Sequence, residues 1–360
     1  MNQLHVIDVA DPAWDGWIES TTHDVYHTAG YHRVAESIDE GTPVLLVFGE
    51  PDHFVAWPYL LQGIPDASDL IGGPAHDVTS TYGYSGPIVR GCDLGDPLID
   101  EAWEAFREHW HEQHVISLFT RFHPILRNDQ WFTGCSSGLN PDRPAVVLTG
   151  ETVSIDLTRP DGEIVAAYPR KFRQEIAQSR RLGFTTSVDA GWAHLDKFIE
   201  LYSETMARNR ARSSYFLKRN YFDKLTDELG SDVILFVGTV GPEVAAACIF
   251  LSHHGILHPH LAGTSTTFLP LSPLKVMWDE VRRWAADRGD RIMHLGGGRG
   301  GSNDSLFSFK ARFSDRRHAF YTGRWILDPK RYEVLVRETQ GSVDPESGHF
   351  PSYRAPRELE

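Results

Sequence analysis

The sequence has 360 residues, enough for two ordinary domains, and its 41% apolar and 23% charged residues are typical of a globular protein. A formal net charge of −14 argues against a generic nucleic-acid-binding protein, because neutralising phosphates requires an excess of lysine and arginine. No apolar run reaches the length of a membrane span, no signal peptide is recognisable, and three cysteines favour a reducing compartment. We therefore expect a cytoplasmic protein without integral membrane association.

Residues 1–150 predict a first α/β domain. The strand LHVIDV is followed by helical residues and by the hairpin Pro43–Leu61, in which a short turn joins two apolar runs. In the next loop, TSTYGYSGPIV, Tyr82 and Tyr84 either pack against the domain or form an amphipathic wall of a binding site. A long amphipathic helix, LGDPLIDEAWEAFREHWHEQ, leads to the strand Val115–Phe122.

Residues 151–336 repeat this order of elements. They open with the strand TVSIDL, contain the hairpin Asp232–Ser252, and continue with the helix SPLKVMWDEVRRWAADRG and the strand RIMHLGG. A helical segment is inserted at about 191–230, and residues 337–360 form a polar C-terminal tail. The repeat predicts two tandem α/β domains with mixed sheets, related by internal duplication.

Basic residues are concentrated in the first part of the second half. From Arg170 to Arg219 the sequence has 11 lysines and arginines against 5 acidic residues, a local charge of +6. Such a segment is typical of solvated helix faces. The alternative is an anion-binding face on an otherwise acidic protein, and the sequence leaves both interpretations open.

A second candidate anion site is the start of the helix in SPLKVMW. Ser272 is a good N-cap, the following proline suits the first helical position, and Lys275 falls in the first turn. Free N–H groups at a helix N-terminus, together with a lysine, can bind a phosphate. A capped structural helix explains the serine and the proline but not the lysine, whose charge opposes the helix dipole.

Four histidines occur in HHGILHPHLAG. His258 and His260 alternate along a strand, and His253 and His254 lie in the turn before it. No cysteine or carboxylate completes a set of metal ligands at a familiar spacing. We therefore expect histidines that line a polar cleft, and no metal site.

The most distinctive stretch is HLGGGRGGSNDSLFSFKARFS, which begins at His294. Gly296, Gly298 and Gly301 satisfy GxGxxG, but the following helix is short and no acidic residue ends the next strand, as a dinucleotide-binding domain requires. A P-loop is excluded because Ser302 stands where that motif has lysine. The glycines instead predict a backbone that another group approaches closely.

A short helix is expected after these glycines. Asp304 or Ser302 can cap it, and Phe309 and Phe313 share a face that should be buried. Lys310 lies next to this face. It is either a solvated lysine or a cation held near the glycines, where it neutralises an oxyanion or a phosphate.

Together these stretches resemble the Fem family of aminoacyl transferases and related tandem GNAT-fold acyltransferases. The resemblance extends from about Tyr26 to Tyr332 and rests on YHTAGYHRV, YGYSGPIV, VSIDL, RKFRQEIAQSRRLGF, LAGTS, LSPLKVMWDEVRRWAADRG and the glycine-rich stretch, in this order. It implies two GNAT-like domains that transfer an aminoacyl group from aminoacyl-tRNA to an amine and form an amide. The implied acceptor is a peptidoglycan precursor or a small molecule.

The resemblance also implies roles for individual residues. Phe309 and Lys310 match the family's phenylalanine–lysine pair, which is associated with the tRNA acceptor end and with catalysis. Lys310 would stabilise the tetrahedral oxyanion or bind the donor's terminal phosphate, and Asp304 or His294 would relay the amine proton. Phe309 or a loop tyrosine would stack on the terminal base. The expected donor- and substrate-binding residues are Phe309, Gly296, Gly297, Gly298, Arg299, Lys275, Ser272, Arg212, Arg33, Tyr82 and Tyr84.

Two features depart from the family pattern. Ala35 follows GYHRV where a lysine is expected in members that bind a nucleotide-linked peptidoglycan precursor, with Arg33 as a substitute for that lysine. The second domain also has no long heptad arm. Both departures leave an unusual amine acceptor open.

Two alternatives keep the fold and change the function. An acyl-CoA-dependent N-acyltransferase would bind the pyrophosphate at the helix after Ser272, and the charge of −14 favours this donor over tRNA. The second alternative is a non-catalytic GNAT-like binding protein. The Phe309–Lys310 pair argues against this alternative. We expect no cofactor beyond the co-substrate; aminoacyl-tRNA and an amine-bearing molecule are the expected partners, and DNA is not.

Overall fold

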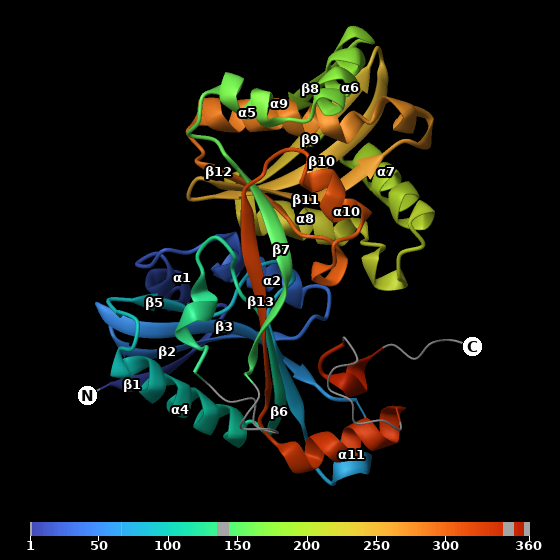
Figure 1. Ribbon diagram of the computed structural model, residues 1–360. Coiled ribbons are helices and arrows are strands. Elements are labelled where there is room, and N and C mark those ends of the chain that lie inside the picture. Colours follow the sequence, from blue (N-terminus) through green and yellow to red (C-terminus); the bar gives the residue numbers. More distant parts are fainter. Residues whose placement is uncertain (1, 66, 135–143, 341–348, 356–360) are drawn as a thin grey trace. The chain divides into compact units, whose positions relative to one another are not determined.

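The structure is a computed structural model that describes residues 2–65, 67–134, 144–340 and 349–355 (Figure 1). The chain forms two compact units. Unit 1 comprises Met1–Thr149 and Phe320–Glu360, and unit 2 comprises Gly150–Ala319. Both units are mixed α/β, as the sequence predicts. Among the described residues, no helix is long and apolar enough to cross a membrane.

The sheet of unit 1 is built around the first predicted hairpin. Its strand order is β1 (Gln3–Asp8), β2 (Thr42–Glu50), β3 (His53–Gly63), β4 (His76–Thr79), β6 (Val115–Arg121) and β13 (Arg317–Ile326), while β5 (Ile88–Arg90) also pairs with β3. The hairpin is confirmed, because β2 and β3 pair with Glu50 opposite His53 across a two-residue turn. β4 and β6 are parallel, and β6 and β13 are antiparallel.

The helices of unit 1 cover this sheet. They are α1 (Ala13–Ile18), α2 (Ala29–Glu36), α3 (Ala67–Ile71), α4 (Pro97–Glu112) and α11 (Pro329–Gln340). The long helix predicted from LGDPLIDEAWEAFREHWHEQ begins at Pro97, because Asp96 accepts a 2.9 Å hydrogen bond from the N–H of Leu98 and Pro97 fills the first helical position. Its buried side packs Trp103 and Trp110 against Trp57 of β3.

The C-terminal segment belongs to unit 1, whereas the sequence-based division assigned it to the second domain up to residue 336 and to a polar tail, 337–360. α11 and the residues after it share one buried cluster, which comprises Ala75, Ile116, Ile326, Tyr332, Leu335, Val336, Phe350 and Tyr353. Tyr353 also donates a hydrogen bond to the Asp77 carboxylate, and Nε of Arg354 lies 2.6 Å from the same carboxylate. Aromatic burial and a partly buried ion pair therefore hold residues 349–355. Of the other positions in the predicted tail, 337–340 end α11, and 341–348 and 356–360 lie outside the described residues.

Unit 2 is built on a second set of paired strands. The strand order is β7 (Val146–Asp156), β12 (Ile292–Gly296), β11 (Ile256–Thr264), β10 (Glu243–His253), β9 (Val233–Val240) and β8 (Phe184–Val188). β9 and β10 form the second predicted hairpin, with Gly241 in the turn at φ 59°. β11 and β12 are the parallel pair of this sheet.

Helices cover both faces of the unit 2 sheet (Figure 1). One face carries α5 (Asp161–Ala167), α6 (Arg170–Arg181), α9 (Pro273–Arg288) and α10 (Ser305–Lys310). The opposite face carries α7 (Leu195–Arg208) and α8 (Arg219–Leu229), the two helices within the predicted segment 191–230. Phe198, Tyr202, Phe222 and Leu225 are buried there, as predicted.

A buried ion pair fixes α9 to the helices beside it. The guanidinium of Arg282 lies 2.9 Å from Asp279 and 2.6 Å from Asp161 at the start of α5. Tyr168 donates a 3.0 Å hydrogen bond to Asp279, and Arg180 of α6 lies 2.6 Å from the same carboxylate. Because removing one partner would leave a buried charge uncompensated, this cluster positions α9 against α5 and α6.

Candidate active site

Residues 297–304 connect β12, which ends at Gly296, to α10, which begins at Ser305. Gly296, Gly300 and Gly301 have φ values of 75°, 58° and 84°, a region that side chains with a Cβ rarely adopt. A Cβ on Gly297 would lie 2.7 Å from the carbonyl oxygen of Glu151, and one on Gly298 would lie 1.9 Å from that of Ser302. The close approach that the sequence predicts is confirmed, and the approaching groups include the protein's own backbone.

Asp304 links this loop to α10 through hydrogen bonds to both. One oxygen of its carboxylate accepts a 2.9 Å hydrogen bond from the N–H of Phe307, and the other accepts a weaker one of 3.4 Å from that of Arg299. Although burial opposes ionisation, these backbone donors keep the pKa of Asp304 below its usual value. Asp304, rather than Ser302, is therefore the N-cap.

Lys310 is the last residue of α10 and returns to the glycine-rich loop. Its Nζ donates a 2.7 Å hydrogen bond to the carbonyl oxygen of Gly297. Burial lowers the pKa of Lys310 to about 8, and the negative charge of Asp304 opposes the shift. Lys310 is thus charged at neutral pH and close to its titration range, so it can stabilise a negative charge that develops beside the loop.

Phe309 packs inside unit 2. Its ring centroid lies 5.2 Å from that of Trp278 on α9 and 5.5 Å from that of Phe313, and the side chain is half-buried. Phe313 is fully buried just beyond the end of α10. Phe309 therefore anchors the helix that carries Lys310, which leaves less of its ring for stacking on a base.

His294 points to the other side of the sheet. Met293 and Leu295 lie in the core beneath α9, and successive side chains of a strand alternate in direction. β11 and β12 pair at Ile256–Ile292 and Leu257–Met293. Immediately after these pairs, the buried rings of His258 and His294 lie 5.2 Å apart. The structure thus brings His258 beside His294, where the parallel pairing ends.

His318 and Ser154 extend this group of polar residues. The His318 ring centroid is 6.4 Å from that of His294, and its Nε2 is 2.7 Å from Oγ of Ser154 on β7. His260, which the sequence places with His258, bonds instead to the hydroxyl of Tyr221 on α8 at 2.9 Å. Sequence reasoning missed His318 and Ser154, because their neighbours come from strands far apart in the chain.

The predicted anion site at the start of α9 is not built as expected. Ser272 occupies the N-cap position, but its backbone is left-handed and its side chain caps no N–H group. Nζ of Lys275 lies 2.6 Å from the Glu175 carboxylate on α6 and 3.2 Å from Oγ of Ser272. Lys275 therefore has an acidic partner, which its position in the first helical turn did not reveal.

The two predicted arginines of unit 2 are exposed. Arg212 precedes the short turn Ser213–Tyr215 between α7 and α8, and Arg299 begins the turn Arg299–Gly301. Neither position is buried. They are accessible to an anion, and Arg299 is part of the same loop as Gly297 and Gly298.

The predicted residues of unit 1 have partners within that unit. Arg33 donates a 3.0 Å hydrogen bond to the carbonyl oxygen of Val9. Tyr82 is 51% exposed, and its carbonyl accepts a hydrogen bond from the Tyr31 hydroxyl. Tyr84 packs edge-on against aromatic neighbours at 5.4–6.1 Å, which are Tyr26, His123 and Phe320. Of the two tyrosines, Tyr82 keeps the larger free surface.

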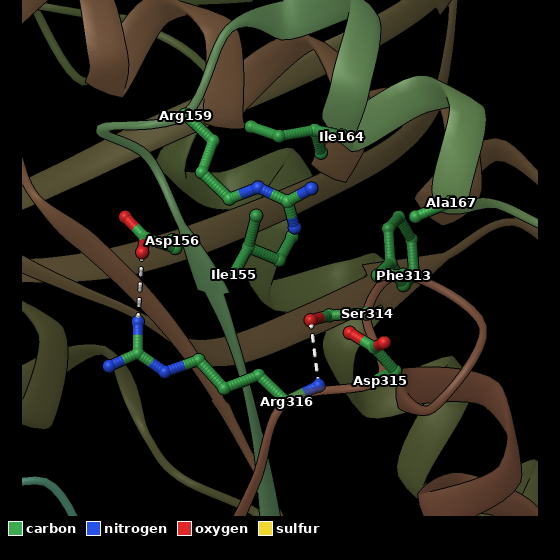
Figure 2. A pocket seen from close by; sticks show the side chains of 9 residues that line it. All are labelled: Ile155, Asp156, Arg159, Ile164, Ala167, Phe313, Ser314, Asp315 and Arg316. Carbon is green, nitrogen blue, oxygen red and sulfur yellow. Dashed lines mark hydrogen bonds and ion pairs between the residues drawn. The ribbon is translucent and has the colours of Figure 1, made fainter.

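A pocket of about 360 Å³ lies beside the end of the glycine-rich stretch (Figure 2). Ile155, Ile164 and Phe313 provide apolar surface, and Arg316 lies 3.3 Å from Asp156. The charged lining residues are Asp156, Arg159, Asp315 and Arg316. Since two arginines face two aspartates, this pocket has no net preference for an anion.

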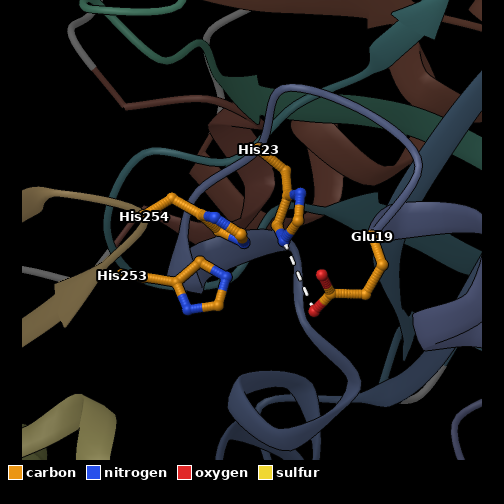
Figure 3. A group of neighbouring side chains, drawn as sticks. All are labelled: Glu19, His23, His253 and His254. Carbon is orange, nitrogen blue, oxygen red and sulfur yellow. Dashed lines mark ion pairs between the residues drawn. The ribbon is translucent and has the colours of Figure 1, made fainter.

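The histidines of the second hairpin have neighbours of their own. Figure 3 shows His253 beside His254, with ring centroids 4.3 Å apart, and His253 also bonds to Asp232 at 2.7 Å. The same figure shows His23 of unit 1 with Glu19, at 4.0 Å. The expectation that no metal binds these histidines stays a prediction.

Comparison with known proteins places the chain in the GNAT fold. Residues 169–304 match the sequence model of the acetyltransferase (GNAT) domain, a range that includes Asp304 and ends before Phe309 and Lys310. No curated protein matches the sequence. The matched range contains α6 to β12 and the glycine-rich loop.

Solved structures extend the likeness over both units. The crystal structure of FemX superposes with a TM-score of 0.63 at 14% identity, covering 92% of this chain and 99% of FemX. The C-terminal domain of a protein named as a lysylphosphatidylglycerol synthetase from Agrobacterium fabrum gives 0.55 at 16% identity, over 86% of this chain and 92% of that domain. L-PGS from Bacillus licheniformis gives 0.54 at 12% identity, over 88% and 92%. The chain thus shares the mixed α/β fold of these proteins over both units, as the resemblance implies, and its residues 169–304 are similar to a GNAT domain.

Proposed function

We propose that this protein forms amide bonds by transferring an aminoacyl group from aminoacyl-tRNA to an amine of a small molecule or a peptidoglycan precursor. The observation that carries the proposal is the hydrogen bond from Lys310 to Gly297, which holds a cation of lowered pKa at the end of β12. The fold likeness to FemX and to proteins named for lysylphosphatidylglycerol supports an aminoacyl donor.

The reaction suits the groups around the loop. An aminoacyl ester is already activated, so the amine nitrogen attacks the ester carbonyl carbon directly, and the ribose oxygen of the tRNA leaves after the tetrahedral intermediate. The enzyme must orient both substrates and stabilise the oxyanion. In this proposal the ammonium of Lys310 provides that stabilisation, and no covalent enzyme intermediate is needed.

The attacking amine must also lose a proton, and His294 is the candidate acceptor. Its ring is buried, and its centroid lies 5.2 Å from that of the buried His258 ring. An imidazole nitrogen of His294 can accept the proton when the amine approaches the end of β12 from this face of the sheet, opposite the face that carries α10. Asp304 is less suited to the role, because backbone N–H groups occupy both of its carboxylate oxygens.

Exposed positive charge supports a tRNA donor. Arg299 lies in the glycine-rich loop and Arg212 between α7 and α8, both accessible to phosphate. Because the ring of Phe309 packs on Trp278, only its exposed part is left for stacking on the terminal base.

An acyl-CoA donor is the second candidate, favoured by the match of residues 169–304 to the acetyltransferase (GNAT) domain. The pairing of Lys275 with Glu175 counts against a pyrophosphate at the start of α9. The structural neighbours favour the aminoacyl donor, and the two candidates differ in one measurable property, the dependence on RNA.

The test is transfer of labelled amino acids from a pool of charged tRNAs to amines in a cell extract, with and without RNase. A parallel reaction contains labelled acyl-CoA, and Lys310→Met is the inactive control. Label that appears in an amide product and disappears with RNase supports the proposal. If label is transferred from acyl-CoA alone, the donor is acyl-CoA and not aminoacyl-tRNA. If no label is transferred from either donor, the result favours a non-catalytic binding protein.

A further inference from the structure

Three side chains of unit 1, outside the proposed active site, bring potential metal-ligand atoms together. A ring nitrogen of His53, Sγ of Cys92 and a carboxylate oxygen of Asp96 all lie within 4.8 Å of one another. His53 and Asp96 are 43 positions apart in the sequence and 2.7 Å apart in space. This separation explains why no spacing motif in the sequence indicates the cluster.

His53 is the first residue of β3, and Cys92 and Asp96 lie in the loop between β5 and α4. β5 pairs with β3 so that Arg90 lies opposite Phe54, which places the residues after β5 next to His53. Gly91 has φ 70°, and a Cβ there would lie 2.2 Å from the carbonyl oxygen of Asp52. The loop that carries Cys92 therefore lies tightly against the turn between β2 and β3, which is the kind of preorganisation that a metal site needs.

We propose that His53, Cys92 and Asp96 bind one Zn²⁺ ion. Imidazole nitrogen, thiolate sulfur and carboxylate oxygen are the ligands that zinc takes in proteins, whereas Mg²⁺ and Ca²⁺ prefer oxygen alone. Three protein ligands leave a fourth position for water. Asp93, next to Cys92, adds negative charge near the cation.

The two carboxylate oxygens of Asp96 have different roles: one caps α4, and the other is available to the metal. Oδ1 accepts the hydrogen bond from Leu98 that caps α4, and Oδ2 faces His53. Zinc bonds of about 2.0–2.2 Å would move the His53 nitrogen and this oxygen apart by roughly 0.7 Å from their present 2.7 Å. The cation would replace the proton that His53 and Asp96 now share, and would release the proton of the Cys92 thiol.

The test uses the full-length, metal-free protein and Zn²⁺ in competition with a chromophoric chelator. We expect a site with one Zn²⁺ per chain, whose affinity falls at least about 10-fold in His53→Ala and in Cys92→Ser. His111→Ala is the matched control, an exposed histidine on α4 of the same unit, and should bind zinc like the unchanged protein. Co²⁺ in place of Zn²⁺ should give a thiolate-to-metal absorption band that Cys92→Ser abolishes.

The Asp96→Asn variant tests the effect of this residue on zinc affinity while the cap of α4 is retained. Asparagine is also a good N-cap, so without zinc this variant should melt like the unchanged protein while its zinc affinity falls. The proposal is overturned if the metal-free protein takes up no zinc, or if zinc binds equally well to His53→Ala and Cys92→Ser. If Cys92→Ser does not fold, absence of the cobalt–thiolate band in the unchanged protein overturns it equally.

Discussion

The two units of this protein have a similar order of elements and opposite charge. Each has an antiparallel hairpin, then a long helix that starts with proline, then a strand directly after that helix. Unit 1 has 12 basic and 29 acidic residues, a net charge of −17, and unit 2 has 23 and 20, a net charge of +3. The acidity of the chain therefore belongs to unit 1, and the argument from net charge against a phosphate-rich partner does not apply to unit 2.

The two units also differ in the segment that follows the strand after the long helix, which is β6 in unit 1 and β12 in unit 2. In unit 2, β12 leads to the glycine-rich loop and to Lys310. In unit 1, β6 leads to His123, whose Nδ1 accepts N–H groups from Ile125 and Leu126, so that its Nε2–H donates to Asp24 at 2.7 Å. His123 and Asp24 are both fully buried. A shared architecture thus supports a titratable cation beside a loop in one unit and a buried histidine–aspartate hydrogen bond in the other.

The largest expected effect is the loss of turnover in Lys310→Met, a substitution in unit 2. Loss of the cation should lower turnover by about 100-fold or more, a magnitude typical of removing one donor that stabilises an oxyanion. The melting temperature should change little, because methionine retains most of the apolar stem. The measurement is single-turnover transfer with the donor that the RNase experiment identifies.

Lys330→Met in unit 1 is the control for that variant. Lys330 is exposed on α11, so its replacement should leave turnover unchanged. Equal rates for Lys310→Met and the unchanged protein would remove Lys310 from the mechanism and would end the functional distinction between the units.

The dependence of turnover on pH is the next largest effect. If charged Lys310 is the active form, turnover falls by about 10-fold per pH unit above a pKa of about 8. Lys310→Arg stays protonated, so this decline should move to higher pH in that variant. A profile that Lys310→Arg leaves in place would assign the decline to another group.

Stability gives an independent check of the same pKa. Burial lowers the folded-state pKa of Lys310 from 10.5 to about 8, so between these values the unfolded chain binds more protons than the folded one. The free energy of unfolding of the unchanged protein, relative to Lys310→Met, should therefore rise as pH increases from about 8 to 10.5. Denaturant titrations at several pH values measure it, and a flat difference contradicts the lowered pKa.

Gly298→Ala tests the loop that unit 1 lacks. The new Cβ would lie 1.9 Å from the carbonyl oxygen of Ser302 and 2.6 Å from the Asp304 carboxylate, so the loop must shift. We expect a destabilisation of about 1–3 kcal/mol and a loss of turnover of about 10-fold. Thermal unfolding and transfer assays check both.

Gly162→Ala is the matched control within unit 2. Gly162 lies in α5, where a Cβ would have no atom within 4 Å, and alanine favours a helix over glycine. This variant should be as stable as the unchanged protein or slightly more so. Equal tolerance of both substitutions would show that the close contacts of Gly298 relax without cost.

The smallest expected effect is that of removing one exposed positive charge from unit 2 on the binding of aminoacyl-tRNA. Arg212→Ala and Arg299→Ala should each raise the KM for aminoacyl-tRNA about 3-fold and reduce the salt dependence of binding by about one phosphate contact. Arg107→Ala is the unit 1 control, an exposed arginine already paired with Glu104 at 3.0 Å. An acyl-CoA donor would show no such change in salt dependence.

The sequence by itself determined the local elements of this protein. The two hairpins, α4, α9 and the strand β12 follow from turn residues, alternation and helix-start signals, which act over a few neighbouring positions, and the choice of a cap for α10 was narrowed to Ser302 or Asp304. The glycine-rich loop and Lys310 were recognisable for the same reason. The resemblance to the Fem family was carried by these local stretches.

The tertiary structure alone decided which distant residues meet. It paired Lys275 with Glu175, turned His294 towards His258, returned Tyr353 and Arg354 to Asp77 in unit 1, and gathered His53, Cys92 and Asp96. Each contact joins residues that are far apart in the chain and depends on how helices and strands pack. Hydrophobic periodicity states which face of an element is buried, but the neighbour on that face is chosen only when the whole core forms.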